Sequence, residues 1–295
     1  MPPRRAPRAA SVEALPTAPV PTSTAEAELV RDPSRPDAVT LYLDDAESSH
    51  VDLADATYLE FEYLQQMLAV LDVARPDEPL RAVHLGGGAC TFARALDALR
   101  PGSTQLVVEL DAELARLVRE WFGLPRAPRL RIRVGDARQV LGTLTPGAWD
   151  VVIRDVFAGP EVPPHVRTLE AAQEARRALR ESGLYLVNLT DRPPLRAARA
   201  EVATLRAVFP HVLLIADPAI LRGRRFGNVV LAASVEPVDV TLLGRALRTL
   251  PLPVQLRHGA EVADFAGTAA PLRDPAPVPD PAALHDSGTA AAAGP

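Results

Sequence analysis

Residues 81–96 read Arg-Ala-Val-His-Leu-Gly-Gly-Gly-Ala-Cys-Thr-Phe-Ala-Arg-Ala-Leu, and residues 105–111 read Gln-Leu-Val-Val-Glu-Leu-Asp, with a Pro-Gly break between them. An apolar strand enters three glycines, a helical pattern leaves them, and a second apolar strand ends in acids. Glycines allow tight turns and close approach of a ligand, and a helix start presents unpaired N–H groups. An acid about 20 residues further on suits the hydroxyls of a ribose. The stretch therefore predicts a site for an adenosine-containing cofactor.

The composition limits the class of protein. The chain has 295 residues, 47% hydrophobic side chains and a formal net charge of −5, which supports a globular core and gives no reason to expect nucleic-acid binding. All 32 basic residues are arginine, which excludes chemistry that needs a Schiff-base or P-loop lysine. The only cysteine, Cys90, and His84 are expected to be packing residues, and we expect neither disulfides nor a metal site. No apolar run suits a membrane span and no signal peptide is visible, so the expected protein is cytoplasmic and binds no membrane.

Texture along the chain divides it into four parts. Residues 1–25 and 266–295 are rich in Pro, Ala and small polar residues without periodicity, so we expect disordered tails there. Residues 38–78 should form a small N-terminal β/α element, with a β-hairpin followed by an amphipathic helix over 58–72. Residues 79–265 should form the main domain.

The main domain alternates strands with helices. Strands are expected at 83–85, 105–110, 130–134, 150–154 and 184–189, and helices at 91–99, 112–122, 140–144, 169–180 and 195–208. Two later strands, 212–215 and 227–233, have no full helix between them, and a short helical piece follows at 242–250. The alternation implies a doubly wound, mostly parallel sheet with an antiparallel edge. The expected fold class is therefore α/β, with a Rossmann-like seven-stranded sheet and a small N-terminal β-hairpin element.

Four consecutive strands of this sheet end in glycine or acid. Ligands of open α/β sheets bind at the carboxyl ends of the strands, where the strand order reverses. The residues at those ends are Gly86, Gly87, Gly88, Glu109, Leu110, Asp111, Asp136, Ala137 and Asp155. Glu109 offers two acceptors to the ribose hydroxyls, and Asp136 suits an adenine amine. Thr91 stands where a pyrophosphate-binding loop has its third glycine, which favours a cofactor without phosphates, such as an S-adenosyl sulfonium compound.

Four motifs carry a resemblance to a known family: Gly-Gly-Gly at 86–88, Val-Glu-Leu-Asp at 108–111, Gly-Asp-Ala-Arg at 135–138 and Trp-Asp-Val-Val-Ile-Arg-Asp at 149–155. From about residue 41 to 233 the chain resembles the class I S-adenosylmethionine-dependent methyltransferase fold and, within it, the spermidine synthase (polyamine aminopropyltransferase) family. The resemblance implies a transferase of polyamine biosynthesis that uses decarboxylated S-adenosylmethionine or S-adenosylmethionine, without a metal. It also implies a small-molecule amine acceptor and a possible homodimer.

The same resemblance assigns roles to single residues. It implies that the glycines, Glu109 with Leu110, and Asp136 with Ala137 hold the cofactor. Asp155 matches the catalytic acid that accepts a proton from the attacking amine. Tyr63 matches a tyrosine near the acceptor, and His165 lies in the loop after Asp155, where it is a weaker candidate for the acceptor pocket. The chemistry agrees, because an alkyl amine is mostly protonated at pH 7 and must lose a proton before its lone pair can attack.

Three departures from the family pattern concern the acceptor more than the cofactor. Ala89 follows the glycines where an aspartate is usual, Ala158 stands three positions after Asp155 where a second aspartate is usual, and Ser48 stands in place of a glutamine. Each lost charge-assisted contact is worth about 1.5–3 kcal/mol, so a doubly charged diamine should bind more weakly. A methyltransferase with another nucleophile and a non-catalytic protein that binds an adenosyl ligand therefore remain alternatives. An NAD-linked oxidoreductase is disfavoured by the altered glycine loop.

Overall fold

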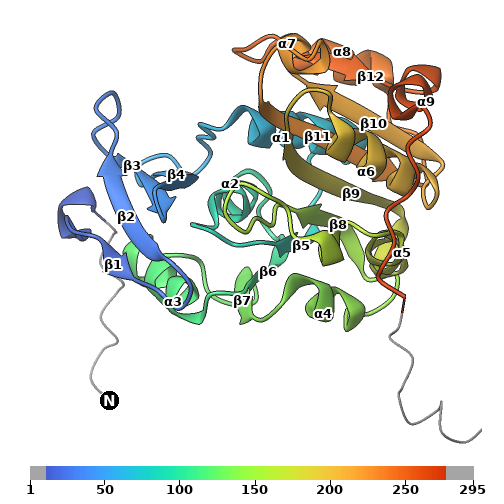
Figure 1. Ribbon diagram of the computed structural model, residues 1–295. Helices are drawn as coiled ribbons and strands as arrows, with labels where there is room; N and C mark the ends of the chain where they lie inside the picture. The colour runs from blue at the N-terminus through green and yellow to red at the C-terminus, as the bar shows by residue number, and fades with distance from the viewer. Residues whose placement is uncertain (1–10, 277–295) are drawn as a thin grey trace, which may run out of the picture.

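The computed structural model of the chain describes residues 11–276 (Figure 1). Its first part is an antiparallel sheet in the order β1-β2-β3-β4. The strands are β1 (Val20–Pro21), β2 (Glu26–Arg31), β3 (Ala38–Leu43) and β4 (Ala46–Asp52). β3 and β4 form the expected hairpin, and Asp44 and Asp45 hold its turn at positive φ, which short polar side chains tolerate. The hairpin is thus half of a four-stranded sheet, not an isolated element.

The prediction of a disordered tail over residues 1–25 is wrong for residues 11–25, whereas residues 1–10 lie outside the described part of the chain. The segment begins with the 3-10 turn η1 (Val12–Ala14) and continues into β1. The backbone N–H groups of Ser23 and Thr24 donate to the Asp111 carboxylate at 3.0 and 2.8 Å, and the Thr22 hydroxyl donates to it at 2.6 Å. The local composition does not indicate that this segment is ordered, because the residue that orders it, Asp111, lies 89 positions along the chain from Thr22.

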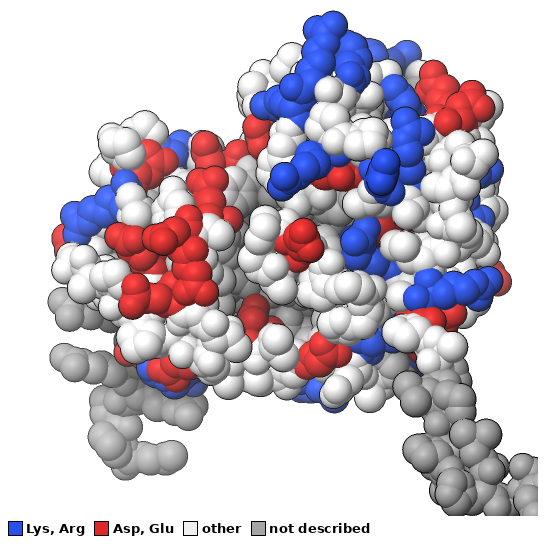
Figure 2. Space-filling view, viewed as in Figure 1, with Lys and Arg blue, Asp and Glu red and all other residues white. Residues whose placement is uncertain are grey.

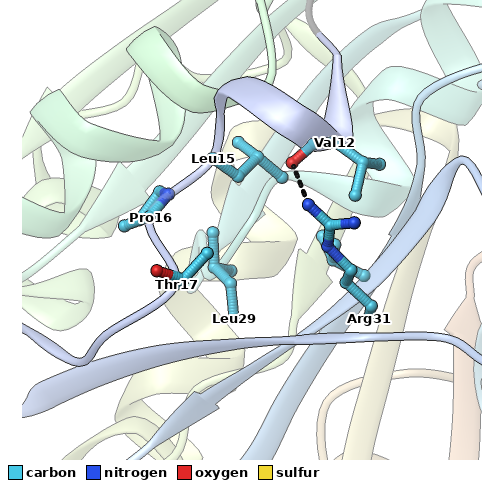
Figure 3. A pocket seen from close by; sticks show the side chains of 7 residues that line it. Val12, Leu15, Pro16, Thr17, Leu29 and Arg31 are labelled. Carbon is cyan, nitrogen blue, oxygen red and sulfur yellow. Dashed lines mark hydrogen bonds between the residues drawn. The ribbon is translucent and has the colours of Figure 1, made fainter.

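A pocket of about 210 Å³ lies where η1 and the residues after it cover the N-terminal sheet (Figure 3). Its lining residues are Val12, Leu15, Pro16, Thr17, Leu29, Arg31 and Val39. The Arg31 guanidinium donates to the Val12 carbonyl at 3.5 Å. This arginine therefore ties the turn to β2, and we attribute the pocket to the packing of the N-terminal sheet.

The second sheet has the order β12-β10-β11-β9-β8-β5-β6-β7. Its strands are β5 (Arg81–Leu85), β6 (Thr104–Glu109), β7 (Leu130–Val134), β8 (Trp149–Arg154), β9 (Leu179–Asp191), β10 (His211–Ala216), β11 (Gly227–Ser234) and β12 (Gln255–Arg257). β5 to β9 are parallel, and β11 and β12 each pair antiparallel with their neighbours. The α/β class, the parallel centre and the antiparallel edge are confirmed. The expected seven strands become eight, because β12 has only three residues and gave no pattern to detect.

Helices cover both faces of this sheet (Figure 1). They are α1 (Glu62–Ala74), α2 (Thr91–Leu99), α3 (Ala112–Trp121), α4 (Ala137–Gly142), α5 (Leu169–Ala178), α6 (Arg196–Arg206), α7 (Pro218–Leu221), α8 (Val240–Leu247) and α9 (Ala260–Ala266), with a 3-10 turn η2 (Pro164–Val166). α4, α5, α6 and α9 bury their apolar sides in one core cluster, and α1, α2 and α8 bury theirs in another. α3 packs with the N-terminal sheet in a third cluster. Among residues 11–276, no helix has the length and apolar character needed to cross a bilayer.

The expected C-terminal tail is ordered as far as residue 276, so the prediction of disorder from 266 is wrong for that part, and residues 277–295 lie outside the described chain. The Leu169 N–H donates to the Leu272 carbonyl at 2.7 Å, and the Leu272 N–H donates to the Thr204 hydroxyl at 2.8 Å. Asp274 accepts a hydrogen bond from the Thr168 hydroxyl and pairs with Arg138 at 3.1 Å. The segment is therefore held against α5 and α6 by hydrogen bonds and an ion pair, which its Pro-rich composition does not predict.

Candidate active site

The glycine loop runs directly against the end of β8. Gly86 has φ +90°, and a Cβ built on it would lie 2.0 Å from the backbone oxygen of Asp155. The N–H groups of Gly87 and Gly88 donate to Oε2 of Glu109 at 3.0 and 3.1 Å. The loop thus joins the three strand ends β5, β6 and β8 into one edge, as the sequence predicted for the point where the strand order reverses.

Replacing Gly86 with alanine should destabilise the fold by at least about 2 kcal/mol, because the added methyl group meets backbone and the residue has positive φ. Gly142 is a matched control: nothing lies within 4 Å of a Cβ there, so Gly142→Ala should be neutral or stabilising by up to about 1 kcal/mol. Urea unfolding measures both variants. Equal midpoints for the two would contradict the close approach of the loop to Asp155.

Glu109 accepts hydrogen bonds from the glycine loop and from the turn after β6. Its Oε2 accepts from two glycine N–H groups and its Oε1 accepts from the Asp111 N–H at 2.9 Å. A carboxylate offers about four acceptor positions, so an acceptor position on Oε1 is left for a ligand. The side chain is half-buried, and the neighbouring Leu110 is 62% exposed and free to contact a bound base.

Asp136 caps the N-terminus of α4 and lies beside His165. The Gln139 N–H donates to Oδ1 of Asp136 at 2.9 Å, and Nε2 of His165 lies 2.9 Å from Oδ2. Burial raises the pKa of the Asp136 carboxyl, but the hydrogen bonds from Gln139 and His165 lower it more, so the group stays ionised. The structure therefore brings His165 to Asp136, whereas the sequence analysis suggested that it lines an acceptor pocket near Asp155. Ala137, the first residue of α4, is buried.

Asp155 lies between α1 and β9. The Tyr63 hydroxyl donates to Oδ2 of Asp155 at 2.8 Å, and Nδ2 of Asn188 donates to Oδ1 at 2.9 Å. Burial raises the pKa of the Asp155 carboxyl, and the bonds from Asn188 and Tyr63 and the Arg154 charge only partly offset this. Burial also raises the pKa of Tyr63, so its hydroxyl remains a donor. A carboxylate with a raised pKa at a strand end is suited to accept a proton.

Asn188 is a site residue that sequence reasoning missed. Its side chain is 1% exposed, and its Oδ1 has no hydrogen-bond partner within the described chain. The only signal in the sequence is an amide in an otherwise apolar strand, Leu184-Tyr-Leu-Val-Asn-Leu189. A buried, unsatisfied acceptor is costly, so an oxygen of this kind beside Asp155 suits a ligand N–H that satisfies it.

Behind Asp155 lies a buried ion network. Arg154, 1% exposed, pairs with Oε2 of Glu201 at 2.7 Å, and Nε of Arg167 binds Oε1 of Glu201 at 2.6 Å. The Arg154 guanidinium also donates to the backbone carbonyls of Val166 and Asn188, each at 3.3 Å. The network thereby connects the end of β8 to β9, to α6 and to the 3-10 turn η2.

Cys90 and His84 serve packing, as expected. Cys90 is 4% exposed, and burial raises the pKa of its thiol to about 12, which excludes a thiolate nucleophile at neutral pH. His84 is 5% exposed and pairs with Gln105 at 2.9 Å, and burial lowers the pKa of its imidazole to about 4. Within residues 11–276, no group of three or more His, Cys, Asp or Glu side chains is placed to hold a metal ion.

Comparison with known proteins gives relatives of two kinds. No model of a known protein family matches the chain. A polyamine aminopropyltransferase of Vibrio vulnificus is 30% identical over 151 residues, which are 50% of this chain and 49% of that protein. The human eEF1A lysine and N-terminal methyltransferase is 26% identical over 172 residues, 53% of this chain and 24% of that protein. The chain thus spans about half the length, or less, of the curated relatives it matches.

A solved structure gives a fuller match. A probable spermidine synthase from Corynebacterium glutamicum is 40% identical, with a TM-score of 0.83, and the match covers 88% of this chain and 96% of that one. Spermidine synthase from Thermotoga maritima has a TM-score of 0.58 at 15% identity, which shows a shared fold only.

Proposed function

We propose a reaction for this chain, which belongs to the spermidine synthase family. The chain is a transferase, and it moves an aminopropyl group from decarboxylated S-adenosylmethionine to an amine acceptor. The observation that carries the proposal is the cluster of Asp155, Tyr63 and Asn188 beside the glycine loop. The cluster supports the proposal because it brings a buried carboxylate, a hydroxyl donor and an amide oxygen without a partner close to the loop that binds Glu109, the residue proposed to hold the ribose.

The residues present fit such a cofactor. The loop at Gly86–Gly88 passes so close to Glu109 and Asp155 that a side chain on the loop would collide with them. Glu109 keeps an acceptor position for the ribose hydroxyls. Asp136, at the neighbouring strand end, would accept from the adenine amine. The sulfonium compound supplies an electrophilic carbon and leaves as a neutral thioether.

Proton transfer is the step that this chain's residues perform. The Asp155 carboxylate takes a proton from the acceptor's ammonium group, which frees the nitrogen lone pair to form the new C–N bond as the C–S bond breaks towards sulfur. Asn188 Oδ1 would hold an N–H of the same nitrogen and so aim its lone pair. Tyr63 and the Asn188 amide fix the orientation of the carboxylate from two sides.

Methyl transfer is the second candidate function. Methyltransferases of proteins are among the relatives, and Ala158 stands at the position where a diamine pocket would use a second acid. The same base and cofactor cradle would serve a nucleophile that attacks a methyl group, so the choice depends on which sulfonium compound reacts.

Binding of sulfur nucleosides tests the proposal. Isothermal titration with decarboxylated S-adenosylmethionine, S-adenosylmethionine and methylthioadenosine should show binding of the first and third, and a saturating ligand at 100 times its Kd should stabilise the fold by about 2.7 kcal/mol. Mass spectrometry of amines after reaction should show an added aminopropyl group. Methyl addition instead would favour the second candidate, and no binding of any nucleoside would contradict both.

A further inference from the structure

A second cavity, of about 190 Å³, lies at the carboxyl end of β9. Its lining combines apolar walls with two acids, two arginines and an aromatic ring: Pro160, Glu161, Val162, Arg167, Leu189, Thr190, Asp191, Arg192, Ala197 and Phe226. None of these residues belongs to the glycine loop or to the cluster of Asp155, Tyr63 and Asn188. The mixture of both signs of charge is what needs an explanation.

The acid Glu161 reaches this cavity through a tight reversal of the chain after Asp155. Ala158 and Glu161 form an antiparallel β-bridge, with Ala158 N–H donating to the Glu161 carbonyl at 2.8 Å. Directly opposed residues of an antiparallel pair project to the same side. The carboxylate absent at Ala158 is therefore supplied three positions later, at the rim of the cavity and not inside the Asp155 cluster.

Two of the four charged side chains that line the cavity, Asp191 and Arg167, already have partners within the protein. Asp191 accepts from the Arg192 and Ala198 N–H groups at 2.7 and 2.8 Å, and Nε of Arg167 binds Glu201. The hydrogen bonds and ion pairs within residues 11–276 engage neither the Glu161 carboxylate nor the Arg192 guanidinium, whose recorded contact is the Phe226 ring at 5.8 Å. One acid and one arginine thus face the cavity with their charges available.

The surroundings favour a ligand that carries an anionic group as well as a cationic one. Arginine side chains gather at the end of the molecule that carries α7 (Figure 2). The connection from α7 to β11, which ends at the cavity residue Phe226, contains the exposed residues Arg222, Arg224 and Arg225, of which Arg225 pairs with Asp217 at 2.7 Å. The positive charge of these arginines disfavours a ligand with two positive charges, whereas it attracts a carboxylate.

The cavity lies within reach of the candidate base. Asn188 touches Asp155, and Thr190 and Asp191 follow two and three residues further along β9, a distance of roughly 7–10 Å at the usual strand rise. Thr190 also donates to the Pro160 carbonyl at 2.9 Å, which holds the turn over the strand end. A chain of five bonds of about 1.5 Å, as between the side-chain nitrogen and the α-carbon of lysine, spans roughly 6–7 Å.

We propose that this cavity binds the α-ammonium and α-carboxylate groups of a free basic amino acid, whose side-chain amine is the nucleophile at Asp155. Glu161 holds the ammonium, and Arg192 holds the carboxylate. The proposal deepens the proposed function, on which it rests, by naming the class of its acceptor. It differs from a diamine site in requiring an anion as well as a cation.

Matched ligand pairs test it directly. Lysine and cadaverine, or ornithine and putrescine, differ only in the carboxylate. Isothermal titration into protein saturated with methylthioadenosine should show each amino acid binding about tenfold tighter, or more, than its decarboxylated partner, the effect of one charge-assisted contact. Lysine with both α-groups blocked, which imitates a lysine within a protein, should lose this advantage. Cadaverine binding as well as lysine, or blocked lysine as well as free lysine, would overturn the inference.

Variants assign the two charges. Arg192→Gln should weaken lysine about tenfold and leave cadaverine unchanged, whereas Glu161→Gln should weaken both. Arg196→Gln, an exposed arginine on α6 outside the cavity, is the control and should change neither. An unchanged lysine affinity in Arg192→Gln would refute the carboxylate assignment. If methylthioadenosine itself fails to bind, the proposed function fails, and the same ligand pairs titrated without it still decide whether the cavity selects an amino acid.

Discussion

Asp155→Asn should reduce the transfer rate by about 10²–10⁴-fold while leaving the affinity for methylthioadenosine within about twofold. The substitution keeps the shape and the contact with Tyr63 but removes the group that accepts the amine's proton. Single-turnover kinetics and isothermal titration measure the two quantities separately. Asp45→Asn, in the exposed β3–β4 turn, is a matched control, because asparagine tolerates its positive φ.

The pH dependence provides a second readout of the same residue. Burial raises the pKa of the Asp155 carboxyl above the ordinary value of an aspartate, and the base works only when deprotonated. The rate should therefore fall as pH decreases through this raised pKa and level off above it. Asp155→Asn should lack that acid limb. A variant with wild-type turnover, or with the same acid limb, would show that another group takes the proton.

The strand ends that the sequence proposes for the cofactor could be located because each of them is set by local sequence. Each strand of β5 to β8 carries its own apolar run and ends in its own glycine or acid, so strand ends could be located one at a time and brought together by the rule for parallel sheets. The predicted helix at 91–99 and strand at 130–134 match α2 and β7 residue for residue. What decided these positions lies within a few residues of them.

The contacts around the proposed acceptor site could not be predicted, because they join residues that are distant in sequence. Asn188 meets Asp155 from 33 positions away, and the turn that brings Glu161 opposite Ala158 depends on a single β-bridge. The ordered N-terminal segment was missed for the same reason, since Asp111 is the residue that orders it. Composition describes what a segment can do alone, and these segments are ordered by residues elsewhere in the chain.

Glu201→Gln should destabilise the fold by about 3–5 kcal/mol, the cost of leaving a buried charge without its partner. Arg154 and Glu201 are 2% and 3% exposed at their side chains, so the Arg154 guanidinium would keep its charge in a place that water cannot reach. The matched control is Glu113→Gln, which breaks an exposed pair with Arg116 and should cost less than about 1 kcal/mol. Urea unfolding with unchanged m-values compares them.

A double variant separates the orphaned charge from lost packing. Arg154→Met combined with Glu201→Leu removes both buried charges and leaves only Arg167, whose side chain is 19% exposed and can be solvated. Buried pairs replaced by apolar residues of similar volume are often neutral or stabilising, so stability should recover towards wild type. Turnover should not recover, because Arg154 also bonds the Asn188 carbonyl and ties β9 to the end of β8 that carries Asp155. If Glu201→Gln unfolds at the same urea concentration as Glu113→Gln, the pair does not stabilise the fold. If the double variant regains full turnover, the network does not position the base.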